Sequence, residues 1–291
     1  MKTSPECIPC MASMAARACG NAGAETARVQ EVVIAAEALL TRADRERNPA
    51  AISSELHRLV TTRLGDADPY ARAKAASNAE AMGLRPALEE RLAQCPDRFD
   101  GAVRLAVAGN IIDLALFDQI DLEATVGRVL REPFAIDHIA RLRRAIDESE
   151  TVFFLTDNAG EVVFDRFLID ELLAMGKRVA LGVKGKPIMN DATADDLPPG
   201  LFDDLEIIPN GSDAVGTALD EVSAPFRARF DAADLVISKG MGNFETLESN
   251  PRPIAFLFQA KCDKIAREVG AHKGALLCIH NALPWRPPTT S

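Results

Sequence analysis

Apolar residues recur every three or four positions through the first half of the chain, from about residue 11 to residue 148. This spacing is typical of amphipathic helices, and the segments are rich in alanine, the strongest helix former. One such stretch contains Val29, Val32, Val33, Ala36, Leu39 and Leu40. Prolines at positions 49, 69, 96 and 133 divide the region, because the residue before a proline is pushed out of the helical conformation. The pattern predicts several helices and no strand in this half.

After Glu150 the pattern changes to short apolar, β-branched runs that alternate with amphipathic segments. The runs are Thr151–Leu155, Arg178–Val183, Leu205–Ile208, Leu235–Ile237, Ile254–Phe258 and Ala275–Ile279. Strands that alternate with helices are typical of βαβ units and of a parallel sheet. The sequence thus predicts a helical domain over residues 1–149 and an α/β domain over residues 150–291.

The segment from Glu161 to Met175 is the clearest single helix in the second half. One helical face collects Phe164, Phe167, Leu168, Leu172 and Met175. Gly176 follows as a C-terminal stop signal. We expect this helix to connect the first two strands.

The net negative charge of the chain limits the kinds of molecule that it can bind. The 291 residues include 43 acidic and 33 basic side chains, which gives a formal net charge of −10. Such a chain repels a polyanionic backbone, and it lacks the excess of cationic contacts that supplies most non-specific affinity for nucleic acids. We therefore expect no nucleic-acid partner.

The chain also lacks the signals of a membrane or exported protein. No apolar stretch reaches the roughly 18 residues that cross a bilayer, and residues 1–20 do not build the apolar segment of a secretory signal. We expect a cytoplasmic protein without a membrane partner. In that reducing compartment the six cysteines are expected to be thiols.

Polar residues and glycines follow four of the predicted strands, at residues 156–161, 184–191, 210–213 and 238–245. Ligands of an open parallel sheet bind at the carboxyl ends of its strands. Asp157 and Asn158 follow the first strand and Asp191 follows the second. Their oxygens suit a hard cation such as Mg²⁺ or Mn²⁺, with positions left open for water and a phosphate oxygen. This pattern predicts a catalytic metal site.

The same residues have a purely structural interpretation. Asp157 and Asn158 could form an Asx turn and cap the following helix, where Glu161 would interact favourably with the helix dipole. Spacing alone leaves both interpretations open.

Lys239 and Gly240 end the fourth strand in a pattern that suits phosphate binding, because an ammonium meets the anion and glycine lets backbone N–H groups approach. An ordinary glycine turn with a solvated lysine is the alternative. The segment is not a dinucleotide fingerprint, since Glu245 stands where a third glycine or alanine is expected. Residues 184–187 do not fit a phosphate-binding P-loop either.

Two further groups occur in the helical half. Asn110 and Asp113 interrupt an apolar helix, so they either face a cleft or mark a kink and a surface face. Cys7 and Cys10 have the spacing of half a zinc site, with Cys19 or Cys262 as additional ligands. The alternative for the pair is two thiols near a helix start. The four histidines show no metal spacing and no nucleophile motif, which disfavours a catalytic triad.

Three segments of the chain resemble the metal-dependent damage-control phosphatase family, formerly a domain of unknown function. They are Leu155–Asp165 (LTDNAGEVVFD), Lys186–Thr193 (KPIMNDAT) and Ser238–Glu245 (SKGMGNFE). The resemblance extends to residues 7–10, to 68–70 with Lys74 and Asn78, and to 108–113, so it covers nearly the whole chain. It is closest to the shorter prokaryotic branch.

The resemblance implies a Rossmann-like, doubly wound, mostly parallel α/β domain behind an all-helical N-terminal domain. It implies a divalent ion held at Asp157, Asn158 and Asp191, and hydrolysis of phosphate monoesters of sugars or damaged metabolites. Lys239 would lie near the phosphate. Residues that match the lining of the family cleft are Asn110, Glu161, Asn190 and Asn243.

These expectations give a mechanism. A cation, Mg²⁺ or Mn²⁺ with Co²⁺ or Ni²⁺ as further candidates, would bind one phosphate oxygen and Lys239 would neutralise another. Either a water molecule at the cation or the Asp157 carboxylate would attack the phosphorus in line.

Two other functions stay open: an S-adenosylmethionine-dependent carboxyl methyltransferase, and a non-catalytic regulatory protein that binds a metal or nucleotide. The sequence does not predict the physiological substrate or the oligomeric state.

Overall fold

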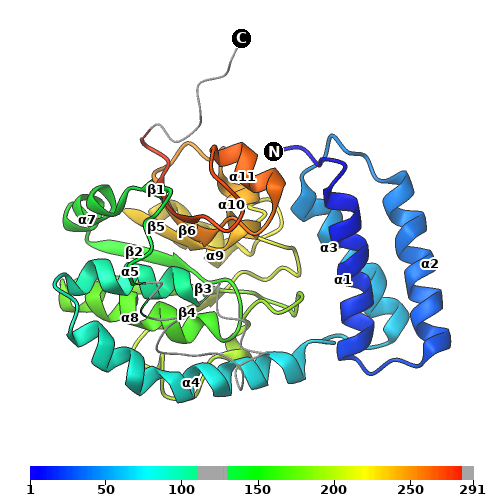
Figure 1. Cartoon of the computed structure of the whole chain (residues 1–291), viewed down its shortest axis with the longest axis horizontal. Helices are drawn as coiled ribbons and strands as arrows, with labels where there is room; N and C mark the ends of the chain where they lie inside the picture. Colours follow the sequence, from blue (N-terminus) through cyan, green and yellow to red (C-terminus); the bar gives the residue numbers. More distant parts are fainter. Residues whose placement is uncertain (110–126, 128–129, 284–291) are drawn as a thin grey trace, which may run out of the picture.

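A seven-stranded sheet forms the centre of the computed structural model, which describes residues 1–109, 127 and 130–283 (Figure 1). The strands are β1 (Ile136–Asp137), β2 (Thr151–Leu155), β3 (Arg178–Val183), β4 (Glu206–Pro209), β5 (Leu235–Lys239), β6 (Ile254–Gln259) and β7 (Leu276–His280). Their order across the sheet is β1-β7-β6-β5-β2-β3-β4. Every neighbouring pair is parallel except β6 with β7. The predicted α/β fold with a mostly parallel sheet is confirmed, as are the six predicted strands.

The expectation that no strand precedes residue 149 is wrong. Ile136 and Asp137 form β1, which pairs in parallel with β7 at the edge of the sheet. Two residues are too few for an alternating pattern to be seen in the sequence. The strand exists because β7 offers a free edge, and the backbone N–H of Ala135 and of His138 extend the pairing by donating to carbonyls of β7.

The inner strands are buried on both faces, as a sheet covered by two layers of helices requires, whereas the edge strands β1 and β4 are partly exposed. Successive residues of β2 alternate, with Val152 and Phe154 in one apolar cluster and Phe153 and Leu155 in the other. The first cluster is covered by α4 (Ala71–Ala93), α5 (Arg98–Ala108), α7 (Ile139–Asp147) and α8 (Glu161–Ala174). The second is covered by α9 (Ala224–Ala232), α10 (Met241–Leu247) and α11 (Asp263–Val269).

The predicted helix between the first two strands is confirmed as α8. Its apolar face is fully buried against the sheet, and Gly176 adopts a positive φ of 75° just after the helix ends. The amphipathic pattern and its glycine stop therefore determine this element locally.

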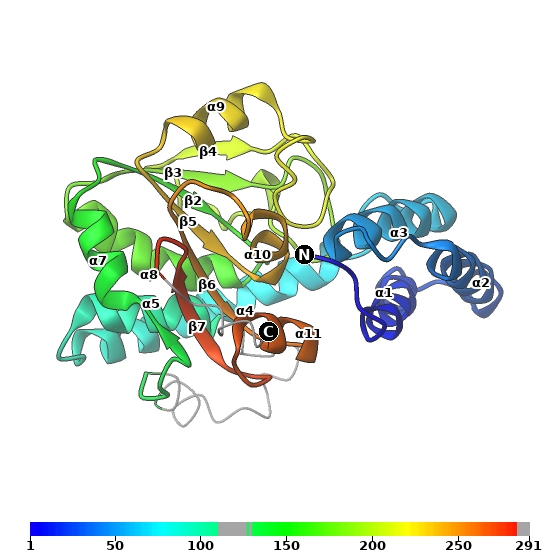
Figure 2. The same cartoon turned by 90° about the horizontal axis from the view of Figure 1, so that it is seen from above.

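The first three helices form a separate bundle beside the sheet, shown in blue in Figure 1 and standing away from the α/β part in Figure 2. They are α1 (Cys7–Asn21), α2 (Thr26–Arg42) and α3 (Pro49–Leu64), and they share their own apolar cluster. Of the other described helices before residue 149, α5 and α7 contact the strands, and α4 packs on α5 and α8. A domain boundary at residues 149 and 150 stays a prediction. No helix in the described part of the chain is both long enough and apolar enough to span a membrane.

Candidate functional site

The candidate site lies where the order of strands reverses. From β2 the chain proceeds through β3 to β4 at one edge and then returns to β5, which pairs with the other side of β2. In doubly wound sheets this switch point is where ligands bind, because the loops after the two strands diverge there. Asp157 follows β2 and Gly240 follows β5, so two of the predicted residues lie at the switch point.

The two segments approach each other closely. Gly240 has a φ of 80°, and a Cβ atom built on it would lie 2.1 Å from Oδ2 of Asp157. No other residue type fits this position, because both the backbone conformation and the space exclude a side chain. Glycine at position 240 thus makes room for the Asp157 carboxylate.

The structure brings together Asp157, Asn158 and Asp191, the three residues that the sequence predicts as metal ligands. Asn158 and Asp191 form an isolated antiparallel bridge. The N–H of Ala192 donates to the carbonyl of Asp157 at 2.8 Å, and that of Ala159 donates to the carbonyl of Asn190 at 2.9 Å. Backbone pairing therefore fixes the loop after β3 against the loop after β2.

Asn158 has one atom available for ligation. Its Nδ2 donates to Oδ2 of Asp157 at 3.0 Å and to Oε1 of Glu161 at 2.8 Å. Both hydrogens of the amide are thus used within the site, and the carbonyl oxygen Oδ1 is the group that could bind a cation.

Burial and neighbouring carboxylates raise the pKa of both candidate acidic ligands. Burial raises the pKa of Asp157 well above its usual value, and the nearby Glu161 and Asp191 carboxylates add to the shift. Burial also raises the pKa of Asp191. A cation between such carboxylates would remove this repulsion, so the donor set fits a metal ion. No group of three or more His, Cys, Asp or Glu residues within the described ranges is arranged to hold a metal, so the Asn158 amide would have to take part.

Asp191 has a cationic partner that the sequence did not assign to it. The side chain is buried, and its Oδ2 lies 3.2 Å from Nζ of Lys184. The same ammonium donates to the carbonyl of Ala214 at 2.9 Å and to that of Gly216. Lys184 thus connects the candidate ligand to the loop after β4.

Lys239 is fully buried, and its ammonium is directed at carboxylates. Nζ lies 2.5 Å from Oδ1 of Asp165 and 3.5 Å from Oε2 of Glu161. Burial opposes the charge on Lys239, but the two carboxylates outweigh it and raise the pKa of the ammonium. Burial raises the pKa of Asp165 to about 7.

Asp165 is a residue that the sequence analysis missed. A signal was present: it lies one helical turn after Glu161, on the buried side of α8 among phenylalanines. An acidic residue in that setting needs a buried partner. Only the tertiary structure identifies that partner as Lys239.

Asn243, Asn190 and Asn110 are the remaining residues that were predicted to line the cleft. Asn243 is buried, and its Nδ2 donates to the carbonyls of Thr156 and Lys239, so it ties the ends of β2 and β5 together. Asn190 is exposed and contributes its carbonyl to the loop pairing. Asn110 and Asp113 lie outside the described residues.

Cys7 and Cys10 lie at the start of α1, where Cys7 is partly buried and Cys10 is exposed. The hydroxyl of Ser4 lies 3.3 Å from Sγ of Cys7. All six cysteines are free thiols, which confirms the expectation from the sequence. The prediction of a structural metal at this pair has no further support among the described side chains.

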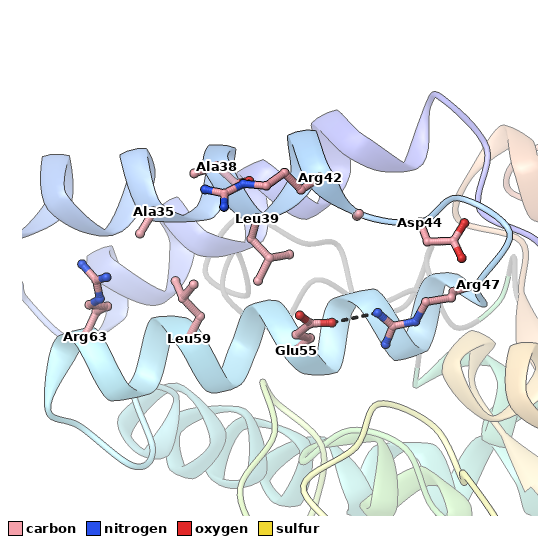
Figure 3. A pocket seen from close by; sticks show the side chains of 10 residues that line it. Ala35, Ala38, Leu39, Arg42, Asp44, Arg47, Glu55, Leu59 and Arg63 are labelled. Carbon is pink, nitrogen blue, oxygen red and sulfur yellow. Dashed lines mark hydrogen bonds and ion pairs between the residues drawn. The ribbon is translucent and has the colours of Figure 1, made fainter.

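A surface groove of about 520 Å³ lies elsewhere, between α2 and α3 of the bundle (Figure 3). Leu39 and Leu59 line it together with three arginines, one of which, Arg47, pairs with Glu55. The groove contains none of the predicted site residues, so it is separate from the switch point.

Comparison with known proteins gives consistent matches. The damage-control phosphatase ARMT1-like domain matches residues 3–277. A damage-control phosphatase from Pyrococcus horikoshii is 35% identical over 286 residues, which cover 97% of this chain and 99% of that protein. A damage-control phosphatase from Archaeoglobus fulgidus is 34% identical over 235 residues, 78% of this chain and 81% of that one. The crystal structure of a DUF89 family protein from Pyrococcus horikoshii matches with a TM-score of 0.90 and 33% identity, over 97% of this chain and 99% of that chain.

Proposed function

Because this chain belongs to the family of damage-control phosphatases with an ARMT1-like domain, we propose that it hydrolyses phosphate monoesters of small metabolites with the help of a divalent cation. The phosphatase activity follows from membership of the family. The need for a cation, the residues that bind it and the class of substrate are our proposal. Sugar phosphates and damaged phosphorylated metabolites are the substrates we expect.

The observation that carries the proposal is the convergence of Asp157, Asn158 and Asp191 from two different loops. Two carboxylates and an amide oxygen form a ligand set for Mg²⁺ or Mn²⁺, and Co²⁺ or Ni²⁺ are further candidates. When bound, such an ion would supply Lewis-acid polarisation of the phosphate and neutralise its charge.

The charge balance of the site supports a divalent ion. Four carboxylates and two ammonium groups lie close together here: Lys184 pairs with Asp191, Lys239 pairs with Glu161 and Asp165, and the charges of Glu161, Asp191 and Lys239 act on Asp157. The carboxylates outnumber these two ammonium groups by two, and with Lys261, whose charge also lowers the pKa of Asp157, the ionised site keeps a net negative charge that a cation would reduce. A phosphate dianion could not approach the uncompensated cluster, because like charges in a buried site repel strongly.

Different side chains of the site would then bind the cation, neutralise the phosphate and hold the two loops together. Asp157 and Asp191 would hold the cation, and Asp157 faces the switch point where a substrate would bind. Lys239 would keep a positive charge next to the phosphate, held in place by Asp165 and Glu161. Asn243 and Gly240 would keep the ends of β2 and β5 close enough for both segments to act on one substrate.

Substitution of the ligands tests the proposal. We expect Asp157→Ala and Asp191→Ala each to lower Mn²⁺-stimulated hydrolysis of p-nitrophenyl phosphate and of a sugar-phosphate panel by about a thousandfold, because each removes a charge that binds the ion. Asp195→Ala is the matched control, since Asp195 is an exposed acid of the same loop and should leave activity unchanged. Full activity in either ligand variant, or wild-type activity that survives EDTA, would contradict the proposal.

Two measurements on the same purified protein distinguish the proposed phosphatase from the alternative functions. Calorimetric titration with S-adenosylmethionine would give binding heat for a methyltransferase, and a purely regulatory protein would show Mn²⁺ binding without turnover on any phosphate ester. We expect no binding of S-adenosylmethionine. We also infer a cytoplasmic location, which agrees with the free thiols.

A further inference from the structure

Helix α4 reaches the candidate site with two polar side chains that the proposed chemistry does not use. Figure 1 shows α4 running from the three-helix bundle along the face of the sheet that α8 covers. Lys74 and Asn78 are four residues apart, so they project from the same side of the helix, one turn from each other. Both contact the segments that carry the proposed metal ligands.

Asn78 bonds to both of these segments with one side-chain amide. Its Oδ1 accepts a hydrogen bond of 2.6 Å from the backbone N–H of Gly160, two residues after Asn158. Its Nδ2 donates to the backbone carbonyl of Asp196 at 2.5 Å, five residues after Asp191. The amide therefore bridges the loop after β2 and the loop after β3.

The chemistry of the bridge requires asparagine. One side must accept from an N–H and the other must donate to a carbonyl, and a carboxamide of this length provides both in a fixed plane. Aspartate could accept from Gly160 but would place a second oxygen against the Asp196 carbonyl. Alanine would leave both backbone groups without this partner.

The Asp196 side of the bridge is itself held firmly. The Asp196 carboxylate accepts from the N–H and the hydroxyl of Thr193 at 2.9 and 2.7 Å, which closes a capping box around the short helix η2 (Ala194–Asp196). Nζ of Lys74 lies 2.7 Å from the same carboxylate and 2.7 Å from that of Asp68. Lys74 is 1% exposed, so this ammonium is shielded from water between its two partners.

Gly160 is the partner of Asn78 at the other end of the bridge, and its position affects the Asn158 side chain. It precedes α8 with a φ of 83°, and its N–H lies in the turn that begins with Asp157 and ends with Glu161. A shift of this turn would move the Asn158 amide, whose donors already bind Asp157 and Glu161. The distance between the two ligand-bearing loops thus depends on a side chain from a distant helix.

We infer that Asn78 is a positioning residue for the cation: together with the backbone pairing between the two loops, it holds the segment of Asp157 and Asn158 at a fixed separation from the segment of Asp191. The inference rests on the proposed function, since it assumes that these three residues bind the ion. It gives α4, and through it the helical half of the chain, a direct part in metal affinity. Partners of this kind, which orient ligands without touching the metal, typically change affinity ten- to a hundredfold.

Mn²⁺ binding to the full-length protein tests the inference, measured by electron paramagnetic resonance of the free ion and by calorimetry. We expect Asn78→Ala to weaken Mn²⁺ binding at least tenfold relative to the wild type. Asn78→Asp keeps the acceptor for Gly160 but sets an oxygen against the Asp196 carbonyl, so it should also weaken Mn²⁺ binding. Ser77→Ala, the neighbouring position on α4, serves as the control and should bind Mn²⁺ like the wild type.

The turnover number provides a second measurement that general destabilisation would not reproduce. If Asn78 acts by positioning, saturating Mn²⁺ should restore kcat of Asn78→Ala to within about threefold of the wild type. Equal Mn²⁺ affinity of the wild type and both Asn78 variants would overturn the inference alone. Absence of Mn²⁺ binding in the wild type would overturn the proposed ligand set, and the inference with it. Should the alanine variant not fold, the aspartate variant decides the question by the same comparison.

Discussion

Individual residues in this site owe their identity to contacts with residues far along the chain. Gly240 leaves space for the carboxylate of Asp157. The ammonium of Lys184 pairs with Asp191 and donates to two carbonyls of the loop after β4. Lys239, 0% exposed, is held between Asp165 and Glu161. A buried ion pair of this kind is weak support for stability, because desolvation offsets the attraction. Its presence at a ligand-binding switch point is better explained by function.

Gly240→Ala tests the close approach at residue scale. A methyl group there would collide with the Asp157 carboxylate, so we expect hydrolysis to fall by about a hundredfold and the protein to lose about 1–3 kcal/mol of stability from backbone strain. Activity assays and urea unfolding of the purified variant measure the two effects.

Gly200→Ala separates the strain from the collision. Gly200 has a similar φ of 78°, and a Cβ atom there would meet nothing within 4 Å. This control should lose stability but keep its activity. Equal activity in the two alanine variants would show that the Asp157 contact has no catalytic consequence.

At the scale of elements, short polar links fix the helices to the sheet. The prediction of a break at Asn48-Pro49 is confirmed: Asn48 caps α3, its Oδ1 accepting from the N–H of Ala50 at 2.8 Å. The Nδ2 of the same side chain donates to the carbonyl of Glu245 in α10 at 2.6 Å. One residue thus begins a helix of the bundle and attaches it to the α/β part.

Substitutions at Asn48 should separate the two contributions. We expect Asn48→Ala to lower the free energy of unfolding by about 1–2 kcal/mol, because it loses both the cap and the link. Asn48→Asp keeps the acceptor for the cap and loses only the donor to Glu245, so it should cost less. Urea titration measures both variants, and an alanine variant as stable as the wild type would contradict the assigned role.

At the scale of the whole molecule, a chain of net negative charge buries several carboxylates where the cation would bind. The formal net charge is −10, and burial together with neighbouring carboxylates raises the pKa of Asp157. Folding without the ion therefore brings like charges together, and binding of the ion should stabilise the folded protein through mass action.

Thermal unfolding with Mn²⁺ and with EDTA tests this coupling. At a Mn²⁺ concentration a hundredfold above Kd, we expect about 2.7 kcal/mol of added stability, seen as a Tm increase of roughly 4–5 °C for a chain of this size. Asp157→Asn should lose this increase. In EDTA the variant should be at least as stable as the wild type, because it removes a repelled carboxylate. A wild-type Tm unchanged by Mn²⁺ would contradict the proposed site.

Local patterns in the sequence predict most of the helices and strands and the place of the candidate site. Helix and strand periodicity are local properties, so α8 and β2 were predicted almost to the residue. The parallel sheet then places residues that follow β2, β3 and β5 at one end, which is why Asp157, Asn158 and Asp191 could be selected as candidates. Their role as ligands stays a prediction.

The contacts of individual side chains depend on tertiary packing. The reversed direction of β7, the short β1 beside it, and the partners of Asp165, Lys184 and Asn78 all depend on segments separated by tens of residues or more. No periodic pattern encodes such pairs, because a hydrogen bond or ion pair depends on the distance between atoms in space. The sequence pattern places polar groups at the carboxyl ends of the parallel strands. The packing of the whole molecule then determines which of these groups contact one another.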